Sequence, residues 1–228
     1  MKFQSLRGMY DLVPDNLSSW QFVESKIFEM LGSYGYKEIR FPIVEYTDLF
    51  KRSVGESTDI VEKEMYSFED RNGDLISLRP EGTAGCVRAC IQNGLLHNQT
   101  QRLYYFGPMF RRERPQKGRQ RQFFQIGVEA FGFPGPDIDL EMIFMTSAMF
   151  KALGLSDVVT LNINTIGAAD DRSKYINSLV EYLQKHESDL DEDSKRRLKK
   201  NPLRILDSKN PDIQRVLSKA PLMIEQRS

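Results

Sequence analysis

Several residue types are scarce in this chain of 228 residues, and each scarcity excludes a class of protein. The two cysteines, Cys86 and Cys90, are too few for a disulfide framework or a structural zinc site. The two histidines, His97 and His186, argue against a histidine-rich metal centre. No apolar stretch approaches the roughly 18 residues of a membrane span, and the first residues, MKFQSLRGMYD, lack a signal-peptide core. We therefore expect a cytoplasmic protein with no membrane partner.

An excess of one charge is also missing, because 32 Lys and Arg residues balance 32 Asp and Glu residues. This balance argues against a protein that coats nucleic acid through bulk charge. The sequence contains neither G-x-x-x-x-G-K-[ST] nor G-x-G-x-x-G, so a phosphate-loop or dinucleotide-binding site is not supported. What remains is an ordinary globular composition, long enough to bury a core as one large or two small domains.

The apolar pattern predicts helices interleaved with strands. A stripe from Trp20 to Tyr34 predicts an amphipathic helix, capped by Asp15 or by the Ser18-Ser19 pair. Residues 37–44, KEIRFPIV, read as a strand whose proline suits a sheet edge or an interface. Asn-Gly at the tip of residues 65–78 predicts a hairpin. Further helices are expected over 81–96, 137–153 and 176–183, and further strands over 103–110, 122–132 and 158–165.

This order of elements favours an α+β fold, an antiparallel sheet flanked by helices, over regular β-α-β units. From about Asp189 the chain is charged, and its apolar residues lack a sustained partner segment. We expect residues 1–168 to form the core, and residues 169–228 to end the core segment and begin a helical insertion that is truncated.

The segment from Arg111 to Arg121, RRERPQKGRQR, places six basic residues around the single acid Glu113, between two strands. A strand–loop–strand arm of this kind would hold guanidinium groups where bidentate contacts to phosphate are favoured. A solvated basic loop explains the composition equally well.

The strand over 122–132 alternates, so that Phe123, Gln125, Gly127 and Glu129 share one face. An unpaired buried polar group costs about 1–3 kcal/mol, so Gln and Glu on a buried face indicate a ligand. A solvent-exposed face would also explain them, but it explains Gly127 less well, because glycine weakens a strand unless something approaches the backbone closely. With the basic arm, this face predicts a site for a phosphate-bearing heterocycle beside a small cation.

Residues 78–85, LRPEGTAG, run from a strand into a helix, with Glu81 and Thr83 in its first turn. Both residues are favoured at a helix start for structural reasons alone. A functional role requires Glu81 to point into the cleft. We interpret Cys86 and Cys90, on one face of that helix, as two semi-buried thiols rather than metal ligands.

Three blocks carry a family resemblance: LRPEGTAG at 78–85, GPMFRRERPQKGRQRQFFQIGVEAFG at 107–132, and GYKEIRFPIVEYTDLFKRSVGESTDIVEKEMYSFEDRNGD at 35–74. They resemble the catalytic domain of histidyl-tRNA synthetases, which are class II aminoacyl-tRNA synthetases. The similarity runs from RGMYDLVP to NPLRILDSKNP, nearly the whole chain. It implies that ATP activates L-histidine to histidyl-adenylate, that the histidyl group passes to tRNA(His), and that a homodimer forms through the helix and proline-bearing strand between Trp20 and Val44.

The resemblance also implies an ATP site on the arm. Arg111 would be the catalytic residue that grips the α-phosphate, and it would also contact the histidine substrate. Glu113 would position the adenine, Phe123 would stack on it, and Arg119 would reach the distal phosphates. Mg²⁺ would accompany ATP on the phosphate oxygens, with no metal site made by the protein alone.

For histidine, the resemblance implies a second set of residues. Glu81, Gly82 and Thr83, together with Gln125, would hold the α-amino group. Glu129 would read the imidazole, since a carboxylate suits an N–H donor.

The chain also departs from the family pattern. Family members continue to a motif resembling L-V-R-G-L-D-Y-Y, a third class II motif and an anticodon-binding domain, and none of these precedes Ser228. We therefore expect an incomplete form of the ligase. The alternative is a catalytically inactive relative that serves as a regulatory subunit in histidine biosynthesis, although the intact arm and RPEGT segment argue against it. A pure RNA-binding module fits poorly, because the basic arm is short and no RNA-binding signature is present.

Overall fold

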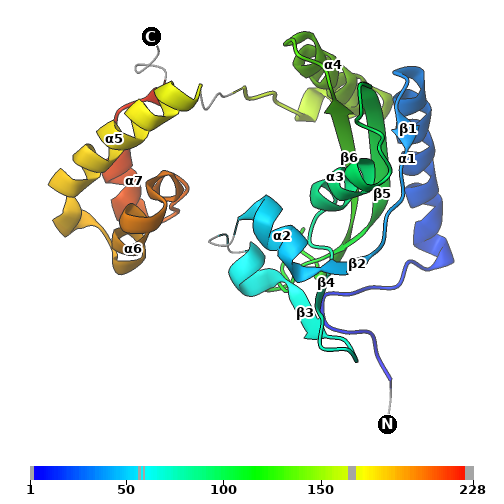
Figure 1. Ribbon diagram of the computed structural model, residues 1–228, viewed down its shortest axis with the longest axis horizontal. Coiled ribbons are helices and arrows are strands. Elements are labelled where there is room, and N and C mark those ends of the chain that lie inside the picture. Colours follow the sequence, from blue (N-terminus) through cyan, green and yellow to red (C-terminus); the bar gives the residue numbers. More distant parts are fainter. Residues whose placement is uncertain (1–2, 56–57, 59, 164–167, 224–228) are drawn as a thin grey trace. The chain divides into compact units, whose positions relative to one another are not determined.

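The structure, a computed structural model, describes residues 3–55, 58, 60–163 and 168–223 (Figure 1). The chain forms two compact units, Met1–Val159 and Thr160–Ser228, and each is described by itself. Among the described residues, no helix combines the length and the apolar character needed to cross a bilayer.

The first helix, α1, spans Pro14–Ser33 and confirms the predicted amphipathic element. Its N-cap is Val13, which makes no side-chain cap, so the expected caps at Asp15 and Ser18-Ser19 are wrong. Pro14 explains the start instead, because proline at the first helical position has a suitable φ and no N–H to satisfy. The chain leaves the helix through Gly35, whose φ of 77° favours glycine.

The strand expected over 37–44 is divided in the structure. Lys37–Glu38 form β1 and Val44–Tyr46 form β2, and the two belong to different sheets. Pro42 lies in the connection between them, where the chain passes from one sheet to the other. Because β1 pairs in parallel with β5, the first sheet is mixed rather than wholly antiparallel.

The first sheet has the order β1–β5–β6, and the second has the order β2–β4–β3. Strands β5 (Gln101–Phe110) and β6 (Gln122–Phe131) pair antiparallel along their whole length. Strands β3 (Tyr66–Glu69) and β4 (Leu75–Leu78) confirm the predicted hairpin. A helix, α2 (Thr47–Val54), and a π-helical turn (Ile60–Glu64) follow β2. Within the described residues, β6 has β5 as its one strand neighbour.

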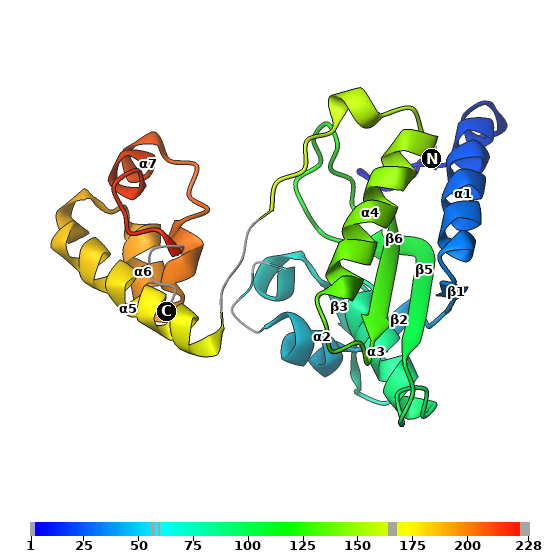
Figure 2. The ribbon, with the colours of Figure 1, turned by 90° about the horizontal axis from the view of Figure 1, so that it is seen from above.

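Helices cover both faces of the first sheet (Figures 1 and 2). Helix α3 (Thr83–Gln92) packs its two cysteines against Leu103, Tyr105 and Met109 of β5. Helices α1 and α4 (Asp137–Ala152) pack against Ile126 and Val128 of β6. The predicted alternation along β6 is therefore confirmed, and so is the α+β fold class.

The strand expected over 158–165 is wrong where the structure describes it. Ser156–Val158 form a 3₁₀ turn, and residues 159–163 form no strand. Val158, Leu161 and Ile163 are 77%, 63% and 74% exposed, so their alternation reflects no buried face among the described residues. Residues 164 and 165 lie outside the described part.

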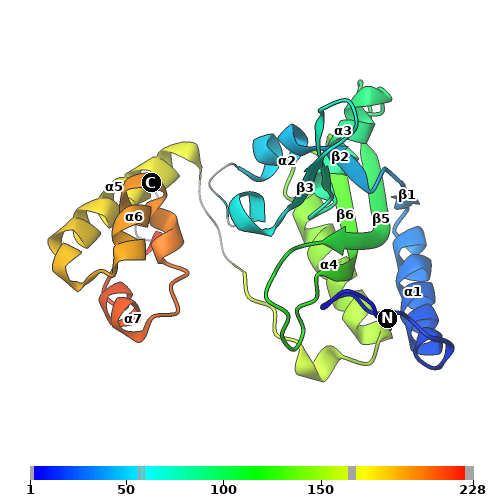
Figure 3. The same cartoon turned by 90° about the horizontal axis from the view of Figure 1, so that it is seen from below.

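The second unit is helical, with α5 (Ala169–Lys185), α6 (Glu192–Lys200) and α7 (Pro211–Leu217) packed together (Figure 3). Short 3₁₀ turns, Glu187–Asp189 and Pro202–Ile205, connect them. Its core consists of Tyr175, Leu179, Leu183, Leu190, Ile205 and Ile213. The expectation that apolar residues after Asp189 lack partners is therefore wrong, because α5 supplies them. The division at residue 168, and the view that residues 169–228 begin a longer insertion, remain predictions.

Candidate active site

The predicted site residues of β6 lie on the face of the sheet that α3 covers. In the register with β5, Met109 lies opposite Phe123, Gly107 opposite Gln125, Tyr105 opposite Gly127 and Leu103 opposite Glu129. Phe123 also packs against the apolar cluster built around Cys86 and Cys90. Strand pairing thus brings the sequence-predicted residues of 122–132 together along one line.

Tyr105 explains two of the glycines. A Cβ built on Gly127 would lie 2.0 Å from Cζ of Tyr105, and one built on Gly82 would lie 2.1 Å from its Cε2. The close approach that Gly127 allows is therefore made by a side chain of the neighbouring strand. The predicted contact between Gly82 and histidine remains a prediction, but the glycine has a packing reason as well. Burial raises the pKa of Tyr105 to about 12, so its hydroxyl is protonated at neutral pH.

Glu81 lies just before α3 rather than in its first turn, because the helix begins at Thr83. Its carboxylate accepts hydrogen bonds from the backbone N–H of Thr83 (2.6 Å) and of Ala84 (3.0 Å). Glu81 and Thr83 also line a groove of about 640 Å³ between α2 and α3. Each carboxylate oxygen has a second lone pair, so capping the helix does not exhaust the acceptors that Glu81 offers.

The far end of the β6 face carries the buried carboxylate of Glu129 and, on Gln125, a buried acceptor that no described donor meets. Burial raises the pKa of Glu129, a hydrogen bond from Thr83 partly offsets this, and the charge of Glu81 adds to it. The Oε1 atom of Gln125 is buried and has no hydrogen-bond partner among the described residues. A buried acceptor left unpaired costs about 1–3 kcal/mol, so this end of the face fits a ligand that brings N–H donors or positive charge.

Arg111 lies at the other end, directly after β5. Its Nε donates a 2.8 Å hydrogen bond to the carbonyl oxygen of Pro80, and its guanidinium carbon lies 5.2 Å from the ring centroid of Phe123. The described residues provide no hydrogen-bond acceptor for its two terminal nitrogens. A guanidinium held at one nitrogen and open at the other two is suited to bind an anion.

Glu113 and Arg119 form an ion pair with each other, with 3.1 Å between Oε2 and Nη1. The arm turns tightly, with a bridge between Gln116 and Arg119 and a φ of 79° at Gly118. Within the described residues, this pair makes no hydrogen bond to Arg111 or Phe123. The four predicted ATP residues are thus brought together as two pairs. An exposed ion pair is worth about 0–1 kcal/mol, so Arg119 can leave Glu113 for a phosphate at little cost.

Cys86 and Cys90 are free and fully buried, rather than semi-buried as expected. Burial raises the pKa of the Cys86 thiol to about 12, which keeps it protonated. In the part of the chain that the structure describes, no three His, Cys, Asp or Glu side chains gather as metal ligands would. The thiols therefore serve the packing between α3 and β5.

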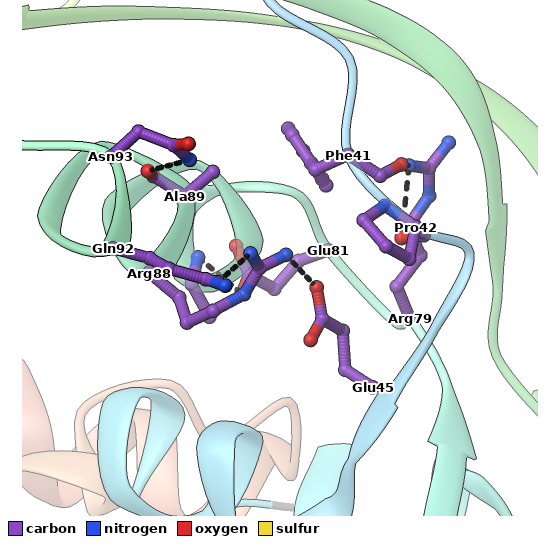
Figure 4. A network of polar contacts seen from close by, with 10 residues as sticks. Phe41, Pro42, Glu45, Arg79, Glu81, Arg88, Ala89, Gln92 and Asn93 are labelled. Atoms are coloured by element: carbon purple, nitrogen blue, oxygen red, sulfur yellow. Dashed lines mark hydrogen bonds and ion pairs between the residues drawn. The ribbon is translucent and has the colours of Figure 1, made fainter. Parts of the chain in front are cut away.

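Two residues that shape the site, Tyr105 and Arg79, were not predicted from the sequence. Alternation in 103–110 places Tyr105 on the site face, and this was a usable signal. Arg79 is 6% exposed and donates to main-chain carbonyls, which no sequence pattern indicates. Figure 4 shows Arg79 beside Phe41 and Pro42, close to a separate ion pair between Glu45 and Arg88.

Comparison with known proteins adds a family. The family model described as histidyl-tRNA synthetase matches residues 8–199. The histidine–tRNA ligases of Legionella pneumophila strains Lens, Philadelphia 1 and Paris are each 61% identical over 224 residues, which is 98% of this chain and 53% of the relative. The chain thus spans about half the length of these curated relatives.

Solved structures agree on the fold. Apo S. aureus histidyl-tRNA synthetase is 34% identical with a TM-score of 0.76, covering 100% of this chain and 51% of that one. A Bacillus halodurans C protein, titled an ATP phosphoribosyltransferase regulatory subunit/histidyl-tRNA synthetase, has a TM-score of 0.61 over 95% of this chain and 55% of its own. At 22% identity the latter shows a shared fold alone.

Proposed function

The chain belongs to the histidyl-tRNA synthetase family, and from that premise we propose that it forms the amino-terminal part of the catalytic domain of a histidine–tRNA ligase. One observation supports this most directly. A single sheet face carries at one end the guanidinium of Arg111, whose terminal nitrogens meet no acceptor among the described residues, and at the other the unpaired Oε1 of Gln125 beside the buried carboxylate of Glu129. Histidine matches this arrangement of a cation at one end and acceptors at the other. Its carboxylate must meet a phosphate, and its amino and imidazole groups need hydrogen-bond acceptors.

On the ATP side, the carboxylate of histidine attacks the α-phosphorus. A new P–O bond forms, the bond to the bridging oxygen breaks, and pyrophosphate leaves. Arg111 offsets the negative charge on the α-phosphate, because its Nε is fixed and its terminal nitrogens meet no acceptor among the described residues. Phe123, already under that guanidinium, offers its ring to the adenine, while Glu113 and Arg119 exchange their ion pair for contacts to adenine and distal phosphates.

On the histidine side, the ammonium group binds at the start of α3. Gln125 supplies the unpaired Oε1, and Glu81 and Thr83 lie at the helix start, with Gly82 between them. Glu129 accepts from the imidazole N–H, and Thr83 holds a hydrogen bond to Glu129 that favours its ionised form.

Mg²⁺ would accompany ATP on its phosphate oxygens. A hard dication prefers oxygen ligands, and the phosphates of ATP supply them. The described side chains form no cluster of three His, Cys, Asp or Glu ligands. The metal would screen phosphate charge, while the chain's own residues orient the nucleotide.

We further propose that tRNA(His) is charged in the cytosol and that the protein forms a homodimer through the helix and proline-bearing segment between Trp20 and Val44, extended by the second sheet into which that segment runs. Several large apolar side chains on β2, β3 and β4 are exposed, a pattern that marks an interaction surface. They are Val44, Tyr46, Phe68 and Leu75. Val44→Asp should lower the mass measured by light scattering from that of a dimer to that of a monomer, and an unchanged dimer would place the interface elsewhere.

The activity is tested in the completed enzyme, which we define as this chain joined to the C-terminal half of the Legionella relative. Arg111→Ala should lower histidine-dependent pyrophosphate exchange about 10²–10³-fold, since loss of one preorganised donor has that effect in such sites. Arg71→Ala, in the exposed hairpin turn, is the matched control and should leave the rate unchanged. An Arg111→Ala enzyme as fast as its parent would mean that the α-phosphate binds elsewhere.

Specificity has its own test. Glu129→Gln should weaken histidine binding far more than ATP binding, and equal losses would contradict the assignment.

The 228-residue chain by itself should bind ATP or histidine weakly and charge no tRNA. If the completed enzyme shows no histidine-dependent exchange at all, the regulatory-subunit alternative gains, although 61% identity to ligases favours catalysis.

A further inference from the structure

Arg79 is a buried cation whose described hydrogen-bond partners are all main-chain carbonyl groups. Its side chain donates from Nε to Pro108 (3.0 Å) and from Nη1 to Phe41 (3.0 Å) and Pro42 (3.5 Å). The residue is 6% exposed, and burial lowers its pKa. The charge of Glu45 offsets part of this effect, but the described residues form no ion pair with Arg79, and burying a charge outside an ion pair costs stability, so a residue that only filled space here would be better apolar.

The main chain of Arg79 is fixed on both sides as well. Its N–H donates to the carbonyl oxygen of Ile43 (2.9 Å), and its own carbonyl oxygen accepts from the N–H of Phe110 (3.0 Å). Gly107 leaves space for the guanidinium, because a Cβ there would lie 2.4 Å from Nη2 of Arg79. Arg79 therefore ties three chain segments together where the two sheets meet, at 41–43, at 79–80 and at 107–110. Figure 4 shows its contacts to the first of these, at Phe41 and Pro42.

Pro80 follows Arg79 in the chain, and Arg111 follows Phe110. These two residues make the hydrogen bond that fixes the Arg111 side chain. Pro80 provides the carbonyl oxygen that accepts from Nε of Arg111, at 2.8 Å. Arg79 thus holds the chain directly before the acceptor and, through Phe110, the chain directly before the donor. Pro80 is fully buried and cannot donate a backbone hydrogen bond of its own, so its placement depends on its neighbours.

We propose that Arg79 is a positioning residue for Arg111: it fixes the Pro80 carbonyl and the end of β5, and so sets where the guanidinium of Arg111 points. Arg79 does not touch substrate. Its importance for turnover rests on the proposed function, in which Arg111 meets the α-phosphate, and there a displacement of about 1 Å can cost about 10²-fold in rate.

The positioning itself is tested without any ligand, in the 228-residue chain. NMR detects the Nε–H group of Arg111, assigned by its disappearance in Arg111→Lys. Arg79→Lys keeps the charge but loses the planar fork that reaches two carbonyls at once. The Arg111 signal should then move to the position of exposed arginines and exchange rapidly with water, while the backbone spectrum of α1 and α4 is retained.

Arg88→Lys is the matched control, because Arg88 is a half-buried arginine that is also fixed near β2, by its ion pair with Glu45, and its hydrogen bonds in the described part of the chain go to Glu45 and Gln92 rather than to Pro80. It should leave the Arg111 signal unchanged. An unaltered signal in Arg79→Lys, or an equal alteration in Arg88→Lys, would overturn the proposal. If Arg79→Lys does not fold, Gly107→Ala displaces the same guanidinium with one methyl group, and the same signal decides.

Turnover gives an independent readout in the completed enzyme. Arg79→Lys should lower kcat for pyrophosphate exchange about 10–100-fold with little change in the KM for histidine, and it should add little in an Arg111→Lys background. Effects that multiply fully would mean that Arg79 acts independently of Arg111. If the parent enzyme shows no exchange, the proposed function fails, but the NMR result still decides whether Arg79 positions Arg111.

Discussion

Replacing Gly127 by alanine tests the packing that shapes the floor of the site. The new Cβ would lie 2.0 Å from Cζ of Tyr105, where ordinary contacts begin at 3.4 Å. The ring is 3% exposed and also contacts Gly82, so it has little room to retreat. Overpacking costs about 1–3 kcal/mol, and this overlap belongs at the upper end. Alanine returns about 0.5–1 kcal/mol through its smaller conformational entropy in a strand, so we expect a net loss of about 2 kcal/mol.

Urea unfolding followed by the fluorescence of Trp20 measures this loss. Trp20 is the one tryptophan of the chain, and its ring lies 5.1 Å from that of Phe124 on β6, so it reports on the unit that carries the change. Linear extrapolation gives the free energy of unfolding. Gly32→Ala is the matched control, because Gly32 lies in α1 with nothing within 4 Å of a new Cβ. It should stabilise the chain by about 0.5–1 kcal/mol.

The same substitution in a chain that lacks the Tyr105 ring tests the steric explanation. Tyr105→Ala alone should cost about 3–5 kcal/mol, as other buried aromatic truncations do. With the ring gone, the three atoms nearest to the added methyl at Gly127 are gone too, and the double variant should be no less stable than Tyr105→Ala. A further loss of about 2 kcal/mol in the double variant, or a Gly127→Ala chain as stable as the parent, would refute the steric explanation.

Other changes probe the charge and hydrogen bonding around the site and the second sheet. Glu129→Gln should raise the free energy of unfolding at pH 7, because burial raises the pKa of Glu129 and makes its ionised form unfavourable in the folded chain. This gain should vanish well below the unfolded pKa of about 4.3, where the carboxyl group is protonated in both states. An equal gain in acid would contradict the explanation. Glu81→Ala should cost about 0.5–2 kcal/mol in urea unfolding by removing the cap of α3, unlike Glu29→Ala at an exposed position of α1. Ser77→Ala should cost about 1–3 kcal/mol, because the hydroxyls of Thr47 and Ser67 lose their shared buried partner.

Local periodicity was sufficient to predict the helices and strands whose apolar spacing is set within the segment itself. The alternation of residues 122–132 predicted both faces of β6, because side chains in a strand point alternately to opposite sides. The helix from Pro14 and the hairpin ending at Leu78 were predicted for similar local reasons. The sequence-predicted residues Phe123, Gln125 and Glu129 do share one face, as that periodicity requires.

Features that depend on remote partners were not predicted. Whether residues 37–44 form one strand or two depends on β4 and β5, which lie far along the chain. The buried role of Arg79 depends on carbonyls of Phe41 and Pro108, and these become acceptors only once the two sheets meet. The core of the second unit was missed because charged residues of α6 obscure the spacing of the apolar ones.

The outer edge of β6 has a practical consequence for anyone who handles this chain. Ten residues, QFFQIGVEAF, have β5 on one side and no strand among the described residues on the other. Natural edge strands discourage aggregation with prolines, bulges or several charges, whereas this one holds a single charged residue, Glu129. Gln122 at its start donates its N–H to the carbonyl oxygen of Gly8, and beyond that residue no described strand pairs with this edge, so a second copy can add a strand here. Purification should therefore use dilute protein, and a synthetic peptide that pairs with β6 should suppress precipitation.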